Sequence, residues 1–297
     1  MQNLESYLEQ NRERIEAALG AVLDDYLADI DEYLAAPIRY ACEGEGKRIR
    51  PILFLAAYAI SGREPDVQVE RLATALEIVH SYSLVHDDLP CMDDDDWRRG
   101  RPTCHKAFGV ERATIAAAAM VPLAGWVAAA EAEALGLSAP ERALLVEELS
   151  EAAGPVGMVG GQVLDLIAEG RSVSGEELAE IHRRKTGALI RASALLGARV
   201  GRTEPRKLEA ISEYGDRIGL AFQIADDLLD ERMAAGGTDP RGDQELGKAT
   251  YPGIYGTDGA RARGLRQARE AVAALRRAGI DSPVLEGLAI HVVERES

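Results

Sequence analysis

Six aspartates lie in the ten positions from 87 to 96, and Arg98, Arg99 and Arg101 follow directly. Carboxylates this close repel one another, and a helix expected to end beside them adds to the repulsion, because its dipole disfavours anions at that end. A hard divalent cation would relieve the repulsion, and a set of carboxylate oxygens suits Mg²⁺ better than zinc. Mg²⁺ held by few carboxylates shares its shell with substrate phosphates, so Arg98 and Arg99 are candidate phosphate ligands.

Pro90 shapes this first acidic cluster. Asp87 and Asp93 are six positions apart, which would place them on nearly opposite sides of a continuous helix. Proline interrupts the helical hydrogen bonding and restrains the residue before it, so a helix over 67–86 is expected to end near Leu89. A short loop then brings Asp93 back beside Asp87.

A second acidic cluster, FQIADDLLD, spans residues 222–230. Asp226 and Asp230 are four positions apart, so they share one face of a helix, and Gln223 and Asp227 lie on or near that face. Taken alone, such a motif is more often a solvated helix face than a functional site.

Basic residues also gather beside glycines in three other segments, GEGKRIRP, HRRKTG and LGKATYP. The first is not a P-loop, because its upstream glycine is missing. Each basic residue alone is best explained as a surface charge. The residues concerned are Lys47, Arg48, Arg50, Lys185 and Lys248.

Composition favours a helical globular protein. The 297 residues are 46% hydrophobic and 28% charged, and Ala and Leu dominate the apolar content. A net charge of −16 excludes general nucleic-acid binding, which needs a basic footprint.

Three irregularly spaced cysteines give no disulfide framework or zinc motif, and we expect reduced thiols in the cytoplasm. The polar N-terminus does not read as a signal peptide, and the apolar run at 114–130 is expected to be a buried helix rather than a membrane span.

Hydrophobic residues recur with helical period over most of the chain, which predicts one all-α domain, residues 1–297, of roughly ten helices. The predicted helical ranges are 15–30, 50–60, 67–86, 105–135, 139–153, 175–199, 205–230 and 259–276.

Six segments, in this order, resemble the trans-isoprenyl diphosphate synthases (polyprenyl synthetases), most closely the bacterial farnesyl diphosphate synthases. The resemblance covers nearly the whole chain. The segments are GKRIRP (46–51), HSYSLVHDDLPCMDDDDWRRGRPTCHKAFG (80–109), GMVGGQVLDL (157–166), HRRKTGALI (182–190), GLAFQIADDLLD (219–230) and LGKATYP (246–252).

This resemblance implies an isoprenoid-synthase-type helical bundle around a central cavity, usually as a homodimer, with the two acidic clusters facing each other across the cavity mouth. They would hold three Mg²⁺ ions, with Mn²⁺ as an alternative. The ligands would be Asp87, Asp93 and Asp226, supported by Asp88, Asp227 and Asp230.

The resemblance also implies a division of the remaining polar residues. The allylic diphosphate would be bound by Arg98, Lys185 and Lys248. Isopentenyl diphosphate would be bound by Gly46, Lys47, Arg50, His80 and Arg99. Oxygen dipoles from Thr186, Gln223 and the Lys185 carbonyl would stabilise an allylic cation.

The implied reaction condenses isopentenyl diphosphate with dimethylallyl or geranyl diphosphate by ionisation, condensation and elimination. Tyr82 lies five residues before Asp87, roughly 7.5 Å up the helix, and Ser83 is one residue nearer. In the family an aromatic residue here goes with a fifteen-carbon (C15) product, farnesyl diphosphate. The alternative is that Tyr82 only packs in the core and that a neighbouring small residue lets the chain pass. The alternative products are geranylgeranyl (C20) and geranyl (C10) diphosphate.

Two other functions fit the sequence less well. A non-catalytic partner subunit usually loses an aspartate motif, and both motifs are intact here. A class I terpene cyclase has Asn, Ser and Glu in its second metal motif, which FQIADDLLD does not match.

The chain departs from the family pattern Gly-Asp-Ala-Leu and has Ala117-Ala118-Ala119-Met120 at the matching positions. The segment between Asp230 and Gly247 is also slightly short and lacks a frequent lysine.

Overall fold

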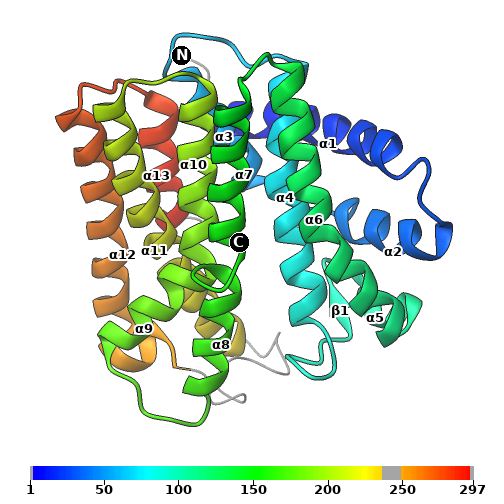
Figure 1. Cartoon of the computed structure of the whole chain (residues 1–297). Coiled ribbons are helices and arrows are strands. Elements are labelled where there is room, and N and C mark those ends of the chain that lie inside the picture. Colours follow the sequence, from blue (N-terminus) through cyan, green and yellow to red (C-terminus); the bar gives the residue numbers. More distant parts are fainter. Residues whose placement is uncertain (1–2, 236–248, 295–297) are drawn as a thin grey trace. The chain divides into compact units, whose positions relative to one another are not determined.

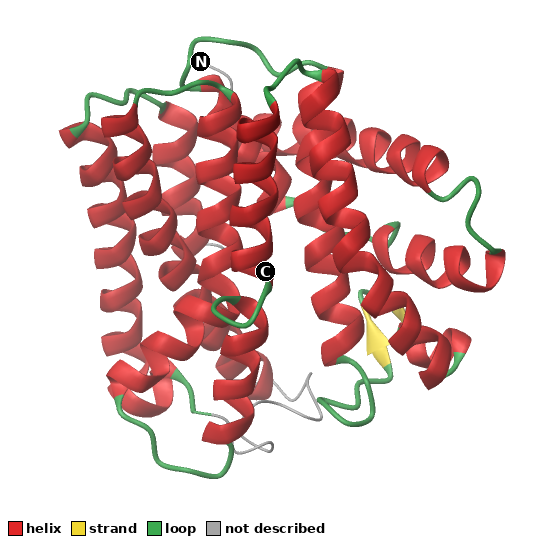
Figure 2. Cartoon of the chain, viewed as in Figure 1, coloured by secondary structure: helices red, strands yellow, loops and turns green. Residues whose placement is uncertain are grey.

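The computed structural model describes residues 3–235 and 249–294, and within them the chain is helical (Figures 1 and 2). The exception is a short antiparallel ribbon of two strands, β1 (Trp97–Arg98) and β2 (Arg101–Pro102). The predicted all-α class is therefore confirmed.

The helices and one π-helical turn follow in chain order. They are α1 (Leu4–Tyr26), α2 (Glu32–Cys42), α3 (Ile49–Ala59), α4 (Val67–Asp87), α5 (Cys104–Phe108), α6 (Val110–Ala134), α7 (Ala139–Ala153), α8 (Met158–Ala168), α9 (Gly175–His182), the π-helical turn η1 (Arg183–Gly187), α10 (Ala188–Val200), α11 (Pro205–Ala235), α12 (Tyr251–Arg277) and α13 (Pro283–Glu294).

The chain divides into two compact units. The first contains Met1–Leu55 and Glu64–Ser150, and the second contains Ala56–Arg63 and Glu151–Ser297. The expectation of one domain stays a prediction.

Helix α4 is central to the first unit, where it contacts α1, α2 and α6. Its N-terminus is fixed by Asp66, whose side chain accepts hydrogen bonds from the backbone N–H groups of Gln68 and Val69, as an N-cap does. It ends at Asp87, close to the end that Pro90 predicts.

Helix α6 is long and apolar enough to cross a membrane by length and composition alone. Core helices of soluble proteins pass the same test. Its buried side chains include Ala113, Ala117, Met120 and Val127, and the helix packs against α2, α4 and α5.

In the second unit, α11 contacts α10, α12, α13 and η1. Glycines allow close approaches to η1. A Cβ atom at Gly161 of α8 would lie 2.1 Å from the backbone nitrogen of Lys185, and one at Gly219 of α11 would lie 2.7 Å from Cα of Gly187. Neither site has room for a side chain, so two helices contact the backbone of the π-helical turn directly.

Two predicted helices are divided in the structure. The range 105–135 is broken at Gly109, whose φ of +87° favours glycine. The range 175–199 is interrupted by η1. Helices α2, α8 and α13 were not among the predicted ranges.

Candidate active site

The end of α4 folds the first acidic cluster back on itself. The backbone N–H of Asp93 donates to the carbonyl of Asp87 at 2.9 Å, while Met92 and Asp94 donate to the carbonyl of Leu89 at 2.8 and 3.2 Å. Asp93 therefore lies beside Asp87, the arrangement expected from Pro90. Both side chains are partly exposed.

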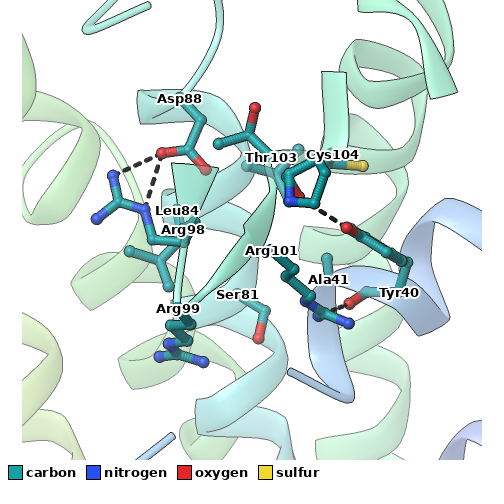
Figure 3. A pocket seen from close by; sticks show the side chains of 12 residues that line it. Tyr40, Ala41, Ser81, Leu84, Asp88, Arg98, Arg99, Arg101, Thr103 and Cys104 are labelled. Atoms are coloured by element: carbon teal, nitrogen blue, oxygen red, sulfur yellow. Dashed lines mark hydrogen bonds and ion pairs between the residues drawn. The ribbon is translucent and has the colours of Figure 1, made fainter. Parts of the chain in front are cut away.

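Asp88 behaves differently from its neighbours, because it is only 3% exposed and is engaged by an arginine. It accepts hydrogen bonds from Nε and Nη2 of Arg98 at 3.0 and 2.6 Å (Figure 3). Arg98 also donates to Asp95 at 2.9 Å. Burial raises the pKa of Asp88, and Arg98 opposes that shift. Asp88 thus orients Arg98 in this structure.

A tight hairpin sets the position of the next arginine. Arg99 and Gly100 join β1 to β2 with φ angles of +53° and +76°, the pair of positive values that a type I′ turn requires. The Arg99 guanidinium reaches His80, with Nη2 and Nε2 separated by 3.5 Å. This ribbon was not among the predicted elements, although Arg-Gly between short extended segments is compatible with it.

His80 is partly exposed and lies among cations. Its Nδ1 is buried and has no hydrogen-bond partner among the described residues. Burial lowers the pKa of His80 well below its ordinary value, and the positive charges of Arg50, Arg99 and Arg48 lower it further. A neutral imidazole surrounded by guanidinium groups forms a site that favours an anion.

Another group of possible metal ligands combines Asp94 and Asp96 with His105, their ligating atoms lying within 4.8 Å of one another. These residues were not among the predicted metal ligands. The ammonium group of Lys106 lies 2.7 Å from Asp96 and already compensates part of this charge.

Tyr82 is partly buried and packs against a cluster of Val85, Leu89, Cys104, Ala113 and Ala117. Its ring lies 5.8 Å from that of His86. The neighbouring Ser83 donates to the carbonyl of His80 at 2.8 Å. Burial raises the pKa of Tyr82, and the charge of Asp87 adds to that shift. The ring therefore packs within the first unit and lies close enough to the first acidic cluster to interact electrostatically with Asp87.

The segment that departs from the family pattern contributes to this packing. Ala117 is 2% exposed and Met120 is fully buried, whereas Ala118, which stands where the family has aspartate, is exposed. An exposed alanine leaves no buried polar partner unsatisfied.

In the second unit, the π-helical turn carries Lys185 and Thr186. Lys185 Nζ lies 2.6 Å from Oδ2 of Asp165 on α8. The hydroxyl of Thr186 donates to Oε1 of Gln223 at 2.7 Å. Asp165 belongs to the segment GMVGGQVLDL, but no role was predicted for it. Irregular turns of this kind occur often at functional sites.

Asp227 joins that network from α11. It is 3% exposed, and its Oδ1 accepts from Nε2 of Gln223 at 3.2 Å, while its Oδ2 accepts from the backbone N–H of Tyr251 at 2.8 Å. Nε2 of His182 lies 3.5 Å from the same Oδ2. Asp227 is therefore bonded to protein groups on both oxygens, whereas Asp226 and Asp230 are partly exposed.

Two expected diphosphate ligands lie in the loop between α2 and α3. Lys47 is exposed, and Gly46 precedes it where the chain passes close to arginines. A Cβ atom at Gly46 would lie 3.0 Å from Nη1 of Arg99. Lys248, the remaining expected ligand, lies outside the described residues.

Comparison with known proteins defines the class. The polyprenyl synthetase family model matches residues 31–278, and the chain belongs to this family. It is 43% identical to the farnesyl diphosphate synthase of Escherichia coli over 256 residues, which cover 84% of this chain and 85% of that protein. It is 36% identical to the farnesyl diphosphate synthase of Geobacillus stearothermophilus, covering 99% and 98% of the two chains.

A solved structure is similar over the same length. The crystal structure of an FPP/GFPP synthase from Zymomonas mobilis aligns with a TM-score of 0.82 at 34% identity, covering 98% of this chain and 99% of that one. The fold and the family are thus supported by sequence and by structure.

Proposed function

We propose that this protein is a prenyltransferase that condenses isopentenyl diphosphate with dimethylallyl or geranyl diphosphate to give farnesyl diphosphate. The observation that carries the proposal is the end of α4, where Asp87 and Asp93 are brought together next to Arg98. A substrate with a diphosphate group suits this combination of carboxylates and guanidinium groups. The similarity to proteins named farnesyl diphosphate synthase supports the same reaction.

Mg²⁺, with Mn²⁺ as an alternative, fits the donor set. Asp87, Asp93, Asp226 and Asp230 offer carboxylate oxygens from partly exposed positions, and carboxylate oxygen is the ligand that these ions prefer. When bound, the metal would neutralise the charge that develops on the departing diphosphate. Asp88 and Asp227 would support the site by orienting Arg98 and Gln223, to which they are hydrogen-bonded.

The chain's own side chains supply the other requirements of the reaction. Arg98, Lys185 and Lys248 would hold the allylic diphosphate, and Lys47, Arg50, His80 and Arg99 would hold isopentenyl diphosphate. Thr186 and Gln223, with the carbonyl of Lys185, would direct oxygen dipoles towards the allylic cation. The hydrogen bond from Thr186 to Gln223 supports this, because it occupies the hydroxyl proton and leaves the hydroxyl oxygen available as a negative pole.

The double bond of isopentenyl diphosphate would be the nucleophile, and the proton lost in the last step would go to the departed diphosphate. The reaction therefore requires neither a side-chain nucleophile nor a side-chain base. The fifteen-carbon product follows from Tyr82, whose partly buried ring would stop the growth of the prenyl product.

We further propose that the enzyme works as a homodimer in the cytoplasm, as the family resemblance implies.

The decisive experiment incubates the purified protein with Mg²⁺, isopentenyl diphosphate and, separately, dimethylallyl or geranyl diphosphate, and sizes the dephosphorylated alcohols. A C15 alcohol is the expected result. A C20 or C10 alcohol would keep the mechanism and overturn the role given to Tyr82. The absence of product from both starters would favour a non-catalytic partner subunit.

A further inference from the structure

Arg48 lies between two of the expected diphosphate ligands but has no role in binding assigned to it. Lys47 precedes it and is exposed, whereas Arg48 is only 4% exposed. The Arg48 side chain therefore turns into the first unit while its neighbour remains at the surface. The question is what this inward arginine does.

Its guanidinium is held by a buried carboxylate. Nη1 of Arg48 lies 2.6 Å from Oε1 of Glu77 on α4, and the two side chains are 2% and 1% exposed. Separating the members of such a pair would leave an uncompensated buried charge, which is strongly destabilising. Each side chain is therefore held in place by the other. Glu77 also lies one helical turn before His80, on the same face of α4.

The same guanidinium closes the loop that leads into α3. Nη2 of Arg48 donates to the carbonyls of Cys42 and Gly44 at 3.2 and 2.5 Å. Cys42 is the last residue of α2, so Arg48 satisfies carbonyl groups at the end of that helix. The hydrogen bonds to Cys42 and Gly44 thus hold the start of the loop between α2 and α3, and the ion pair with Glu77 holds its end.

The backbone of Arg48 is left-handed, with a φ of +51°. This conformation is unfavourable for a residue other than glycine and persists only where surrounding interactions enforce it. Here the bonds to Glu77, Cys42 and Gly44 supply that enforcement. This backbone conformation accompanies a change from the exposed side chain of Lys47 to the buried side chain of Arg48. The carbonyl of Arg48 accepts a hydrogen bond from the backbone N–H of Ile52 in the first turn of α3.

The ion pair also sets the charge around His80 and Arg99. Burial lowers the pKa of Arg99; Glu77 opposes this shift, while Arg48 adds to it. Glu77 therefore compensates part of the positive charge where Arg48, Arg50 and Arg99 surround His80. The buried carboxylate of Glu77, together with the carboxylate of Glu16 at 3.8 Å from Nε of Arg48, offsets part of the repulsion among these cations.

We propose that Arg48 and Glu77 are positioning residues, whose buried ion pair holds the loop so that Lys47 and Arg50 meet His80 and Arg99 on the diphosphate of isopentenyl diphosphate. This inference rests on the proposed function. It predicts an effect on that one substrate: the pair determines the KM for isopentenyl diphosphate, and leaves the KM for the allylic substrate nearly unchanged.

The main test is the double variant Arg48→Met/Glu77→Leu, which removes both charges together and fills the space with apolar atoms, a replacement that often preserves stability. The KM for isopentenyl diphosphate should rise by about tenfold to about a hundredfold, the scale of effect of a displaced binding group. The KM for geranyl diphosphate should stay within about threefold of wild type, well below that displacement effect.

Arg48→Lys is the second variant. It keeps a charge opposite Glu77 but has fewer donors for the two carbonyls, and should give a smaller rise in the same KM. If the double variant does not fold, this substitution still tests the proposal. The matched control is Arg14→Met/Glu70→Leu, which removes another ion pair of α4 and should leave both KM values unchanged.

Calorimetric titration of isopentenyl diphosphate provides a readout that does not depend on turnover. Loss of affinity in the Arg48 variants, with a normal melting temperature, would support the positioning role. Parallel increases in both KM values, or unchanged affinity for isopentenyl diphosphate, would overturn it. A wild-type protein that binds isopentenyl diphosphate but forms no prenyl product would overturn the proposed function alone.

Discussion

Gln223 and Asp227 are joined by a hydrogen bond of 3.2 Å that determines which way the Gln223 amide faces. Because Nε2 donates to Asp227, Oε1 is directed to Thr186, whose hydroxyl donates to it at 2.7 Å. A carboxylate from the second acidic cluster thus fixes the orientation of two neutral side chains that we assign to the allylic cation. In this assignment, the second aspartate of the motif would act through its neighbours.

The substitution Asp227→Asn should reduce kcat and stability together. Asparagine has one oxygen, so it cannot accept from both Gln223 and Tyr251, and one buried donor loses its acceptor. We expect a loss of about 1–3 kcal/mol in the free energy of unfolding, the usual cost of an unsatisfied buried group. Denaturant unfolding and steady-state kinetics measure the two effects. An unchanged kcat would show that the amide orientation has no part in catalysis.

The substitution Asp226→Ala should abolish most activity without unfolding the protein. Asp226 is partly exposed, so its removal leaves no cavity comparable to that of a core residue. We expect kcat to fall by at least about 10²–10³-fold, as for other groups that stabilise transition-state charge. Circular dichroism should report an intact fold. Asp87→Ala should behave in the same way, and full activity in either variant would contradict the proposed metal ligands.

Replacement of Tyr82 tests how the product length is set. Tyr82→Ser removes the ring that packs near Ala113 and Ala117, and should shift the product from C15 towards C20. Tyr82→Phe keeps the ring and should retain the C15 product. Chromatography of the dephosphorylated alcohols distinguishes these outcomes. A C15 product from Tyr82→Ser would mean that the ring only packs in the core.

The acid stability of the second unit should depend on Glu286. Arg276 donates to its two oxygens at 2.9 and 2.6 Å, and this pair lowers the pKa of Glu286 below the ordinary value of 4.5. A lowered carboxylate pKa stabilises the fold above pH 4.5, and that contribution is lost as the pH falls through the folded-state value.

Melting temperatures of wild type and Glu286→Gln measured between pH 7 and pH 3 test this dependence. The difference between the two proteins should shrink as the pH falls. The exposed Glu9→Gln is the control and should change the curve less. A difference that grows on acidification would contradict the sign of the pKa shift.

Much of the first acidic cluster follows from sequence because its cause is local. Pro90 ends α4 near Asp87, and the return of Asp93 needs only the short loop that follows. The shared face of Asp226 and Asp230 likewise follows from helical spacing. By contrast, a glutamate at position 77 gives no sign in the sequence that it is buried against Arg48, because the pairing depends on a loop distant in the chain.

The π-helical turn was also beyond sequence reasoning. Its residues, Arg183–Gly187, continue a helical pattern, and only the close approaches of Gly161 and Gly219 distinguish them. The bond between Asp88 and Arg98 depends on the β1–β2 ribbon in the same way, since the ribbon brings the arginine back to the end of α4.

Helix α11 runs without interruption from Pro205 to Ala235 and carries Gly219, Gln223, Asp226 and Asp227. The roles that we propose for these residues therefore depend on their sharing one rotational phase of the helix. Inserting one residue after Gly219 would rotate everything beyond it by about 100°, turning the acidic face away while the glycine contact stayed in place. A substitution changes this helix at one position only, whereas an insertion or a deletion within it would disturb all the positions beyond. We therefore expect related chains to differ in length at the connections to α11 and not within the helix.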